Sequence, residues 1–179
     1  MLYMLQKCSI LKVAAVFFDE PTKEHYLIEV SKKSKLAHTS VKRHLDALKK
    51  LEVIKEYVEE KGNRQYPIYK ANINNDAYRY YKKILNMIQL KELVRYLKDS
   101  LMPKSIVLFG SYQKGEDIED SDIDIFVECK EEKIDLIRFR KQLNRNIELH
   151  FKKNFNEYPK ELKNNIINGT ILDGYLEVF

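Results

Sequence analysis

The feature that constrains this chain most is a glycine turn followed, after ten residues, by a pair of aspartates. The apolar run Ile106–Phe109 leads directly into Gly110-Ser111, and a second apolar run begins at Asp122-Ile123-Asp124 and ends near Val127. Because side chains alternate along a strand, both aspartates share one face while the isoleucine between them points to the core. The pattern predicts two strands that bring a tight, phosphate-accommodating turn close to paired carboxylates.

Paired carboxylates of this kind indicate a metal site. Two negative charges held close together repel each other, and a divalent cation with oxygen ligands, Mg²⁺ or Mn²⁺, relieves that repulsion. Glu148 lies in the next predicted strand and joins Asp122 and Asp124 if that strand neighbours theirs. His150 shares the Glu148 face, but oxygen-rich sites rarely use imidazole, so a supporting or structural role is expected for it.

The turn itself carries groups suited to a triphosphate. Gly110 allows the backbone to approach phosphate closely, and Ser111 offers a hydroxyl and the N–H of a helix start. Lys114 can add positive charge near the phosphates. The acidic residues that follow, Asp117, Glu119 and Asp120, are expected to form an ordinary solvated loop.

Gly-Ser, ten residues and Asp-x-Asp resemble the signature of the minimal nucleotidyltransferases, a branch of the DNA polymerase β superfamily, over about residues 101–179. Lys114 stands where many members carry arginine, which keeps the charge but loses the bidentate fork. The third carboxylate is commonly aspartate on the next strand, and Glu148 is the candidate here. The segments that match the family pattern are Phe109-Gly110-Ser111, Gly115, Ser121-Asp122-Ile123-Asp124 and the tail Ile167–Gly174.

The resemblance implies a metal-dependent nucleotidyltransferase that moves a nucleoside monophosphate, AMP from ATP in the first instance, to an acceptor hydroxyl while pyrophosphate leaves. Glu148 would take the acceptor proton or ligate a second metal ion. The residues implied in nucleotide binding are Gly110, Ser111, Lys114 and Ser121. Those implied in catalysis and in binding Mg²⁺ or Mn²⁺ are Asp122, Asp124 and Glu148.

The acceptor stays open among a protein side chain, a nucleic-acid end and a small molecule. A protein is the first choice, as in antitoxins that adenylylate a partner HEPN-type toxin. The predicted catalytic region is small and neutral, with 18 Lys/Arg and 18 Asp/Glu over residues 76–179. No separate acceptor-binding domain is recognisable beside it.

The first part of the chain has the pattern of helices followed by a hairpin. Apolar spacing predicts two helices, a third helix that Thr39 or Ser40 caps, and two strands. Pro67 must lie at a sheet edge or a bulge, because it has no N–H to donate. This order resembles the winged helix-turn-helix domain over about residues 1–72. The predicted helices cover 1–20, 24–33 and the segment from the cap onward, and the predicted strands cover 54–58 and 65–69.

The winged-helix resemblance implies a surface for double-stranded DNA. Residues 1–75 hold 14 Lys/Arg and 9 Asp/Glu, so the whole net charge of +5 lies there, which suits a polyanionic partner. The third helix would enter the major groove and the wing would reach the backbone. A protein–protein module on the same fold is the alternative. The residues implied in DNA contact are Ser40, Lys42, Arg43 and His44 on the helix and Lys61 and Arg64 at the wing tip.

The expected fold class is α+β, with a small mixed sheet and flanking helices in the second domain. Residues 76–100 are predicted to form one long helix or two, packed as a connector or, alternatively, as a homodimer contact, with Tyr81, Ile84, Leu85 and Ile88 buried. The predicted domains are a winged helix-turn-helix over 1–74, a connecting helix over 75–100 and a nucleotidyltransferase domain over 101–179. Within the last, the predicted elements are strand 106–109, a short helix, strand 123–129, helix 131–145, strand 147–151 and a helix that Gly169 ends.

Composition bounds the remaining function classes. No apolar run in the 179 residues approaches the roughly 18–20 residues of a membrane span, so a cytoplasmic protein without a membrane partner is expected. Cys8 and Cys129 are isolated, which favours reduced thiols over a disulfide or a zinc site. The competing function is a DNA-binding transcriptional regulator, in a toxin–antitoxin-like operon, whose second domain senses nucleotide or is inactive.

Overall fold

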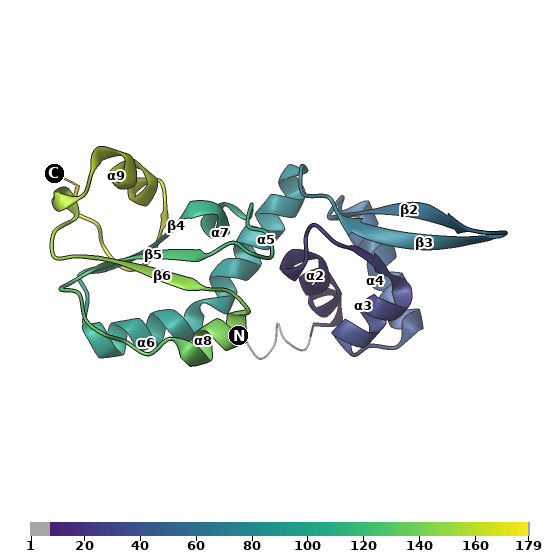
Figure 1. Ribbon diagram of the computed structural model, residues 1–179, viewed down its shortest axis with the longest axis horizontal. Helices are drawn as coiled ribbons and strands as arrows, with labels where there is room; N and C mark the ends of the chain where they lie inside the picture. Colours follow the sequence, from purple (N-terminus) through teal and green to yellow (C-terminus); the bar gives the residue numbers. More distant parts are fainter. Residues whose placement is uncertain (1–7, 179) are drawn as a thin grey trace. The chain divides into compact units, whose positions relative to one another are not determined.

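The computed structural model describes residues 8–178 (Figure 1), and the chain divides into two compact units between Lys82 and Lys83. Both units combine helices with a small β-sheet, which confirms the predicted α+β fold class. The predicted helix over residues 1–20 is described from Ser9, and its beginning lies outside the described residues. None of the helices within residues 8–178 has both the length and the apolar content that a membrane crossing requires.

The first unit places its helices against an antiparallel sheet with the strand order β1-β3-β2. Helical periodicity brings Val13, Phe17, Val30 and Leu45 together as fully buried core residues. The Tyr78 hydroxyl donates a hydrogen bond to the carbonyl of Phe17 at 3.1 Å, so the first part of α5 belongs to this unit. The elements are α2 (Ser9–Asp19), β1 (Glu24–Tyr26), α3 (Leu27–Ser34), α4 (His38–Lys50), β2 (Ile54–Lys61), β3 (Arg64–Ala71) and the start of α5 (Asp76–Gln89).

The start of α3 differs from the predicted helix over 24–33. Residues Glu24–Tyr26 form β1, which pairs with β3, and the helix begins only at Leu27. The Tyr26 backbone N–H donates a hydrogen bond to the Glu29 carboxylate at 2.9 Å, which fixes the helix start at this point. Apolar spacing alone does not reveal such a bond, so it does not show that the helix starts three residues later than predicted.

The backbone shows where α4 begins and how β3 accommodates Pro67. The helix α4 begins at His38 after the extended residue Ala37, so the predicted caps Thr39 and Ser40 lie inside its first turn. Pro67 lies in the central strand β3, but the pairing of β1 with β3 ends at Ile68. The strand therefore has a free edge at Pro67, where a residue without an N–H is tolerated, as the sequence predicts.

The second unit is built on a mixed sheet with the order β6-β5-β4-β7. Strands β5 and β6 are parallel, whereas β4 runs antiparallel to both β5 and β7. The elements are the end of α5, α6 (Lys91–Leu101), β4 (Ser105–Phe109), α7 (Gly110–Lys114), β5 (Ile123–Glu128), α8 (Ile137–Leu143), β6 (Ile147–Lys152), the 3₁₀ turn η1 (Phe155–Glu157), α9 (Lys160–Ile167) and β7 (Thr170–Gly174).

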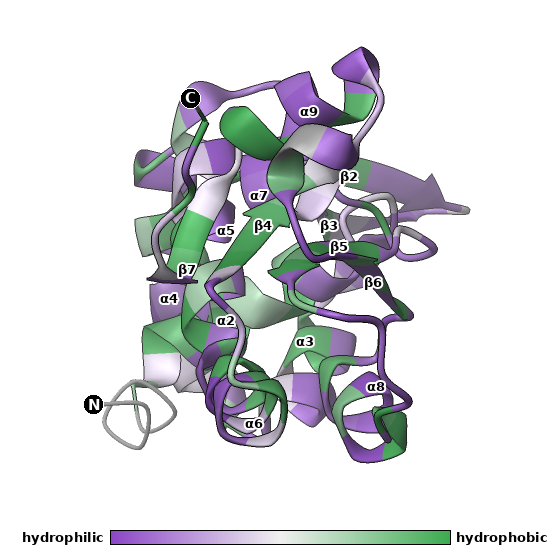
Figure 2. Cartoon of the chain, turned by 90° about the vertical axis from the view of Figure 1, so that its left-hand side faces the viewer, coloured by the Kyte–Doolittle hydropathy of each residue, from purple (hydrophilic) through white to green (hydrophobic). Residues whose placement is uncertain are grey.

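Strand alternation divides the apolar side chains of this unit between the two faces of its sheet. Ile123 and Ile125 pack with Leu93 and Phe139 on the side of α6 and α8. On the opposite side, Phe126 packs against residues of η1 and α9. Figure 1 shows α6 and α8 on one side of the sheet and α9 on the other, and Figure 2 shows the apolar strands β4 and β5 between them. Position 124 alternates with its apolar neighbours and lies on the α9 side.

The helix α8 is shorter than the predicted helix over 131–145. It spans Ile137–Leu143, and the segment 130–136 has no regular structure. The Asp135 carboxylate accepts a hydrogen bond from the Ile137 N–H at 2.9 Å. Local side-chain bonds of this type compete with the helical backbone pattern, which explains the late start.

The buried face of the segment after Asp76 also differs from the prediction. The chain forms two helices there, and Tyr81 is 40% exposed instead of buried. Tyr78, Asn86 and Leu90 are buried, whereas Ile84, Leu85 and Ile88 are only partly covered. The helix thus turns a polar side chain, Asn86, into the interior of the second unit.

Candidate active site

The glycine turn joins β4 to the short helix α7. Gly110 has a φ of +78°, a conformation that L side chains rarely adopt. A Cβ atom at this position would lie well under 3.0 Å from Oδ2 of Asp124. Both the backbone conformation and the space therefore require glycine, and the turn is in direct proximity to the aspartate on β5.

The parallel pairing of β5 and β6 sets Asp124 directly beside Glu148. The sequence predicts that Glu148 joins the carboxylates if its strand lies next to the strand of Asp124, and β6 does pair with β5. Ligand atoms of Asp124, Glu148 and His150 all lie within 4.8 Å of one another. Among the described residues 8–178, this is the one group of three potential metal ligands that lie so close together. Asp122 precedes β5 and is not a member of that cluster.

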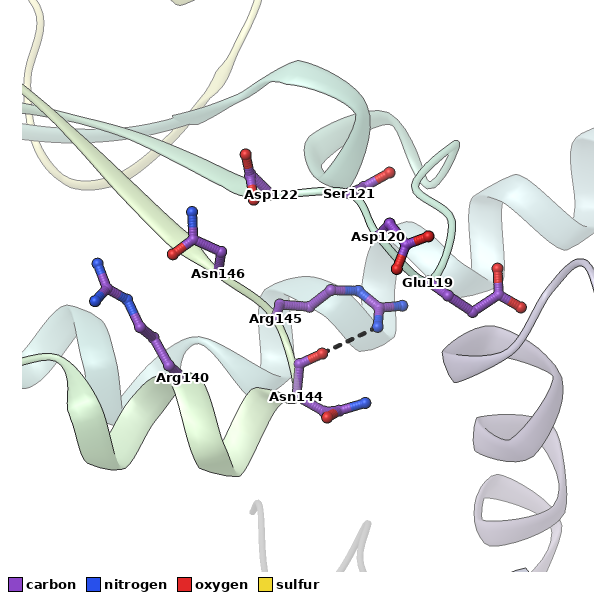
Figure 3. A pocket seen from close by; sticks show the side chains of 8 residues that line it. All are labelled: Glu119, Asp120, Ser121, Asp122, Arg140, Asn144, Arg145 and Asn146. Carbon is purple, nitrogen blue, oxygen red and sulfur yellow. Dashed lines mark hydrogen bonds between the residues drawn. The ribbon is translucent and has the colours of Figure 1, made fainter.

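Asp122 instead borders a pocket of about 440 Å³ (Figure 3). Figure 3 shows Asp122 and Asn146 on the two neighbouring segments that lead into β5 and β6, with Arg140 reaching up from α8. The Arg140 guanidinium donates a hydrogen bond to the carbonyl of Ile147 at 3.1 Å. The complete lining is Glu119, Asp120, Ser121, Asp122, Arg140, Asn144, Arg145 and Asn146. The pocket offers carboxylate, amide and guanidinium groups to a polar ligand that reaches Asp122.

The other residues predicted to bind nucleotide lie around the same turn. Ser111 is half-buried and Lys114 is exposed, both on α7. The Ser121 hydroxyl accepts a hydrogen bond from the Ile118 N–H at 2.9 Å, so in this structure it closes the loop before Asp122. Ser121 thereby helps to fix the approach of the chain to the first aspartate.

The loop between α7 and β5 is anchored by a buried polar group that the sequence did not reveal. Asp117 is buried, which corrects the expectation of a solvated acidic loop at this position. The Asn86 side-chain amide donates hydrogen bonds to the Asp117 carboxylate and to the Tyr112 carbonyl of α7, each at 2.9 Å. Arg145, also buried, lies 3.7 Å from the same carboxylate. One side chain of α5 therefore ties the Gly110 turn to the loop that leads to Asp122.

Substitution Asn86→Ala is expected to lower the free energy of unfolding by about 1–3 kcal/mol, because it removes a donor shared by two buried acceptors. Asn86→Asp is expected to cost more, since it sets a second carboxylate against Asp117. Urea denaturation measures both changes. Asn165→Ala, at an exposed position of α9, is the control and should change stability by no more than about 0.5 kcal/mol. Equal costs for the buried and the exposed asparagine would contradict the anchoring role.

In the first unit, the residues implied in DNA contact fall into different environments. Lys42 and Arg43 are exposed on α4, whereas His44 is buried beside Val41 and Leu45. Burial, with the charge of Arg43 nearby, lowers the pKa of His44, so its imidazole is neutral near pH 7. A buried His44 is not available for the DNA contact that the winged-helix resemblance implies for it. Ser40 is half-buried in the first turn of the same helix.

The predicted wing tip presents less net positive charge than Lys61 and Arg64 alone would give it. Lys61 donates a hydrogen bond to the Tyr26 hydroxyl at 2.7 Å and lies 3.2 Å from the Glu59 carboxylate. Hydrogen bonds to Tyr26 and Glu59 raise the pKa of Lys61, and the carboxylate offsets its charge. Arg64 is exposed at the start of β3.

Comparisons with known proteins locate the site within a family. A sequence model described as a nucleotidyltransferase domain matches residues 90–173. A Methanocaldococcus jannaschii protein named "Putative protein adenylyltransferase MJ1379" is 42% identical over 86 residues, covering 41% of this chain and 86% of that protein. Another from the same organism, "Putative protein adenylyltransferase MJ1215", is 43% identical over 53 residues, covering 27% of this chain and 62% of that protein.

A solved structure named "Possible transcriptional regulator from Methanosarcina mazei Go1" covers 55% of this chain and 87% of its own, at 21% identity and a TM-score of 0.36. This similarity is too low to support a conclusion about fold or function. The family match lies within the second unit, where the turn and the carboxylates are found. The chain belongs, through that unit, to the nucleotidyltransferase domain family.

Proposed function

We propose that the second unit transfers AMP from ATP to a hydroxyl group on another protein. The observation that carries the proposal is the proximity of the Gly110 turn to the paired carboxylates of Asp124 and Glu148, within a domain of this family. The names of the two M. jannaschii relatives specify protein adenylyltransferase, which supports a protein as the acceptor. A HEPN-type toxin is the first partner to test.

The donor groups fit a divalent cation, Mg²⁺ or Mn²⁺. Asp124 and Glu148 present oxygen ligands from adjacent strands, and Asp122 lies at the entrance to the same strand pair. Asp124 and Glu148 are like charges on directly paired positions, and a divalent cation between them relieves their repulsion. When bound, the ion neutralises phosphate charge and polarises the α-phosphate.

Each residue of the turn and the strands has its own task in this reaction. Gly110 and Ser111 bind phosphate oxygens through backbone N–H groups and the hydroxyl, and Lys114 adds positive charge at the end of α7. Glu148, whose side chain is 56% exposed, accepts the proton of the attacking hydroxyl. The acceptor oxygen bonds to the α-phosphorus, the bond from that phosphorus to the bridging oxygen breaks, and pyrophosphate leaves with the electron pair.

The proposal is tested by incubating the purified chain with ATP, Mg²⁺ or Mn²⁺, and an extract of its own cells. Label from the α-phosphate is expected to appear on a protein, with one pyrophosphate released for each AMP attached. ATP labelled at the γ-phosphate is the control, and the chain should add no label from it beyond that of the extract alone, because in AMP transfer that phosphate departs. Absence of transfer from ATP and from the other nucleoside triphosphates would reject the enzymatic function.

A second candidate function, binding of double-stranded DNA, rests on the first unit. The observation that favours it is the exposed pair Lys42 and Arg43 on α4, in the region that holds the whole net charge of +5. Such a helix could enter the major groove. The chain would then act as a regulator, with or without the transferase activity of the second unit.

Duplex DNA binding by Lys42→Ala/Arg43→Ala is expected to be weaker and less dependent on salt than that of the unmodified chain. Each phosphate contact removed should lower the slope of log K against log[salt] by about 0.9. Lys61→Ala should have a smaller effect, because Glu59 already offsets that charge. Fluorescence anisotropy at several salt concentrations measures the slopes. Unchanged binding by the double variant would exclude this surface of α4.

A further inference from the structure

We infer that His150 is a direct ligand of the metal site, and that its nitrogen makes the site prefer a divalent transition ion such as Mn²⁺ to Mg²⁺. The inference rests on the proposed function and concerns the same site. It departs from the supporting role that the sequence predicts for this histidine. Neither the family match nor the relatives' names assign this residue.

The distances within the cluster match those between ligands of one ion. His150 Nε2 lies 3.5 Å from Oδ1 of Asp124 and 4.0 Å from Oε1 of Glu148. With metal–ligand bonds of about 2.1 Å, two ligand atoms at right angles are about 3.0 Å apart, and two opposite ones about 4.2 Å. Both separations from His150 fall between these limits, and the ligand atoms of all three residues lie within 4.8 Å of one another, so small side-chain rotations can bring them around one ion.

The fold holds the imidazole in this position from two directions. His150 pairs with Phe126 in the register of β5 and β6, two residues beyond Glu148 on the same face of the strand. Its ring packs against that of Phe109, the last residue before the glycine turn, with 5.0 Å between the ring centres. The histidine side chain is only 21% exposed. The ring edge that carries Nε2 is therefore directed at the carboxylates and not at solvent.

Donor chemistry decides which ion such a set favours. Mg²⁺ selects oxygen ligands and retains much of its hydration shell, whereas imidazole suits transition ions such as Zn²⁺, Fe²⁺ and Ni²⁺, and Mn²⁺ is the transition ion that also accepts carboxylates. Two carboxylates and one imidazole form a mixed oxygen and nitrogen set. Replacing the imidazole by an amide keeps a polar side chain of similar length but takes away the nitrogen ligand.

The test measures metal binding by the full chain without nucleotide. Mn²⁺ is expected to bind at least about tenfold more tightly than Mg²⁺ in competition titrations, and pulsed EPR of bound Mn²⁺ should show coupling to an imidazole ¹⁴N. His150→Asn should abolish that coupling and weaken Mn²⁺ binding by more than the roughly 10–100-fold typical of losing a partner that only supports a ligand, with a smaller effect on Mg²⁺. His38→Asn, at an exposed histidine of α4, is the matched control and should change neither quantity.

Each outcome decides between the inference and the proposed function. Bound Mn²⁺ without ¹⁴N coupling, or with an affinity that His150→Asn leaves unchanged, would show that the histidine only donates a hydrogen bond to Asp124 and would overturn the inference. Absence of Mn²⁺ binding at any concentration tested would overturn it too. Coupling in a chain that transfers no AMP would support the inference while rejecting the proposed function, and transfer without coupling would do the opposite.

Discussion

Asp124→Asn is expected to reduce AMP transfer by at least about 10³-fold, the scale on which single electrostatic contributions to catalysis operate. Asparagine has nearly the same shape, but its neutral amide is a far weaker partner for a cation than a carboxylate. Asp124 is central to the site, because it adjoins the Gly110 turn, pairs with Glu148 in the sheet and lies 3.5 Å from His150. Initial rates of label transfer from α-labelled ATP measure the effect.

The same substitution should leave the fold intact, which separates a catalytic from a structural role. Asp124 and Glu148 are like charges on directly paired positions, so neutralising one should hold or raise the free energy of unfolding, by about 0.5 kcal/mol. Asp99→Asn, at an exposed position of α6, is the control for a lost carboxylate and should retain transfer. A variant that transfers AMP at the original rate, or one that unfolds, would remove Asp124 from its proposed role.

The sequence predicts much of this site because its information is local. Alternation along a strand places Asp124 on the face opposite Ile123 and Ile125, and the glycine that opens α7 indicates a conformation that other residues avoid. The predicted pairing with Asp122 is not reproduced in the cluster, because Asp122 lies before β5 begins. Whether Glu148 lies beside Asp124 cannot be read from the sequence alone. Strand order and the parallel direction of β6 depend on contacts between segments far apart in the chain, and only the fold supplies them.

The features that the sequence does not predict are buried polar side chains, because a polar residue is expected to face solvent unless its buried partners are known. Asn86 stands among apolar residues of α5, yet it is buried and binds both Tyr112 and Asp117. Its spacing of four residues before the buried Leu90 is the one signal that could have identified it. The sequence likewise groups His44 with its charged neighbours, although it occupies a buried position three residues after Val41.

Gly110→Ala is expected to abolish transfer and to destabilise the second unit by about 1–3 kcal/mol, the range for a residue forced into a sparsely populated conformation. Two separate causes act together. The φ of +78° strains any L side chain, and the added methyl group would lie well under 3.0 Å from Oδ2 of Asp124. Either the turn or the carboxylate must move, and both movements disrupt the proximity on which phosphate and metal binding depend.

A double-mutant cycle separates the two causes. In an Asp124→Ala background the contact with Oδ2 is absent, so Gly110→Ala should cost less stability there than in the unmodified chain. Gly62→Ala provides the cost of a positive φ alone, because Gly62 has a φ of +61° and nothing within 4 Å of an added Cβ. Urea denaturation of the four members of the cycle gives the coupling between positions 110 and 124. Additive costs would show that the added methyl group does not clash with the Asp124 carboxylate. The loss of transfer would then come from the strained backbone of the turn alone.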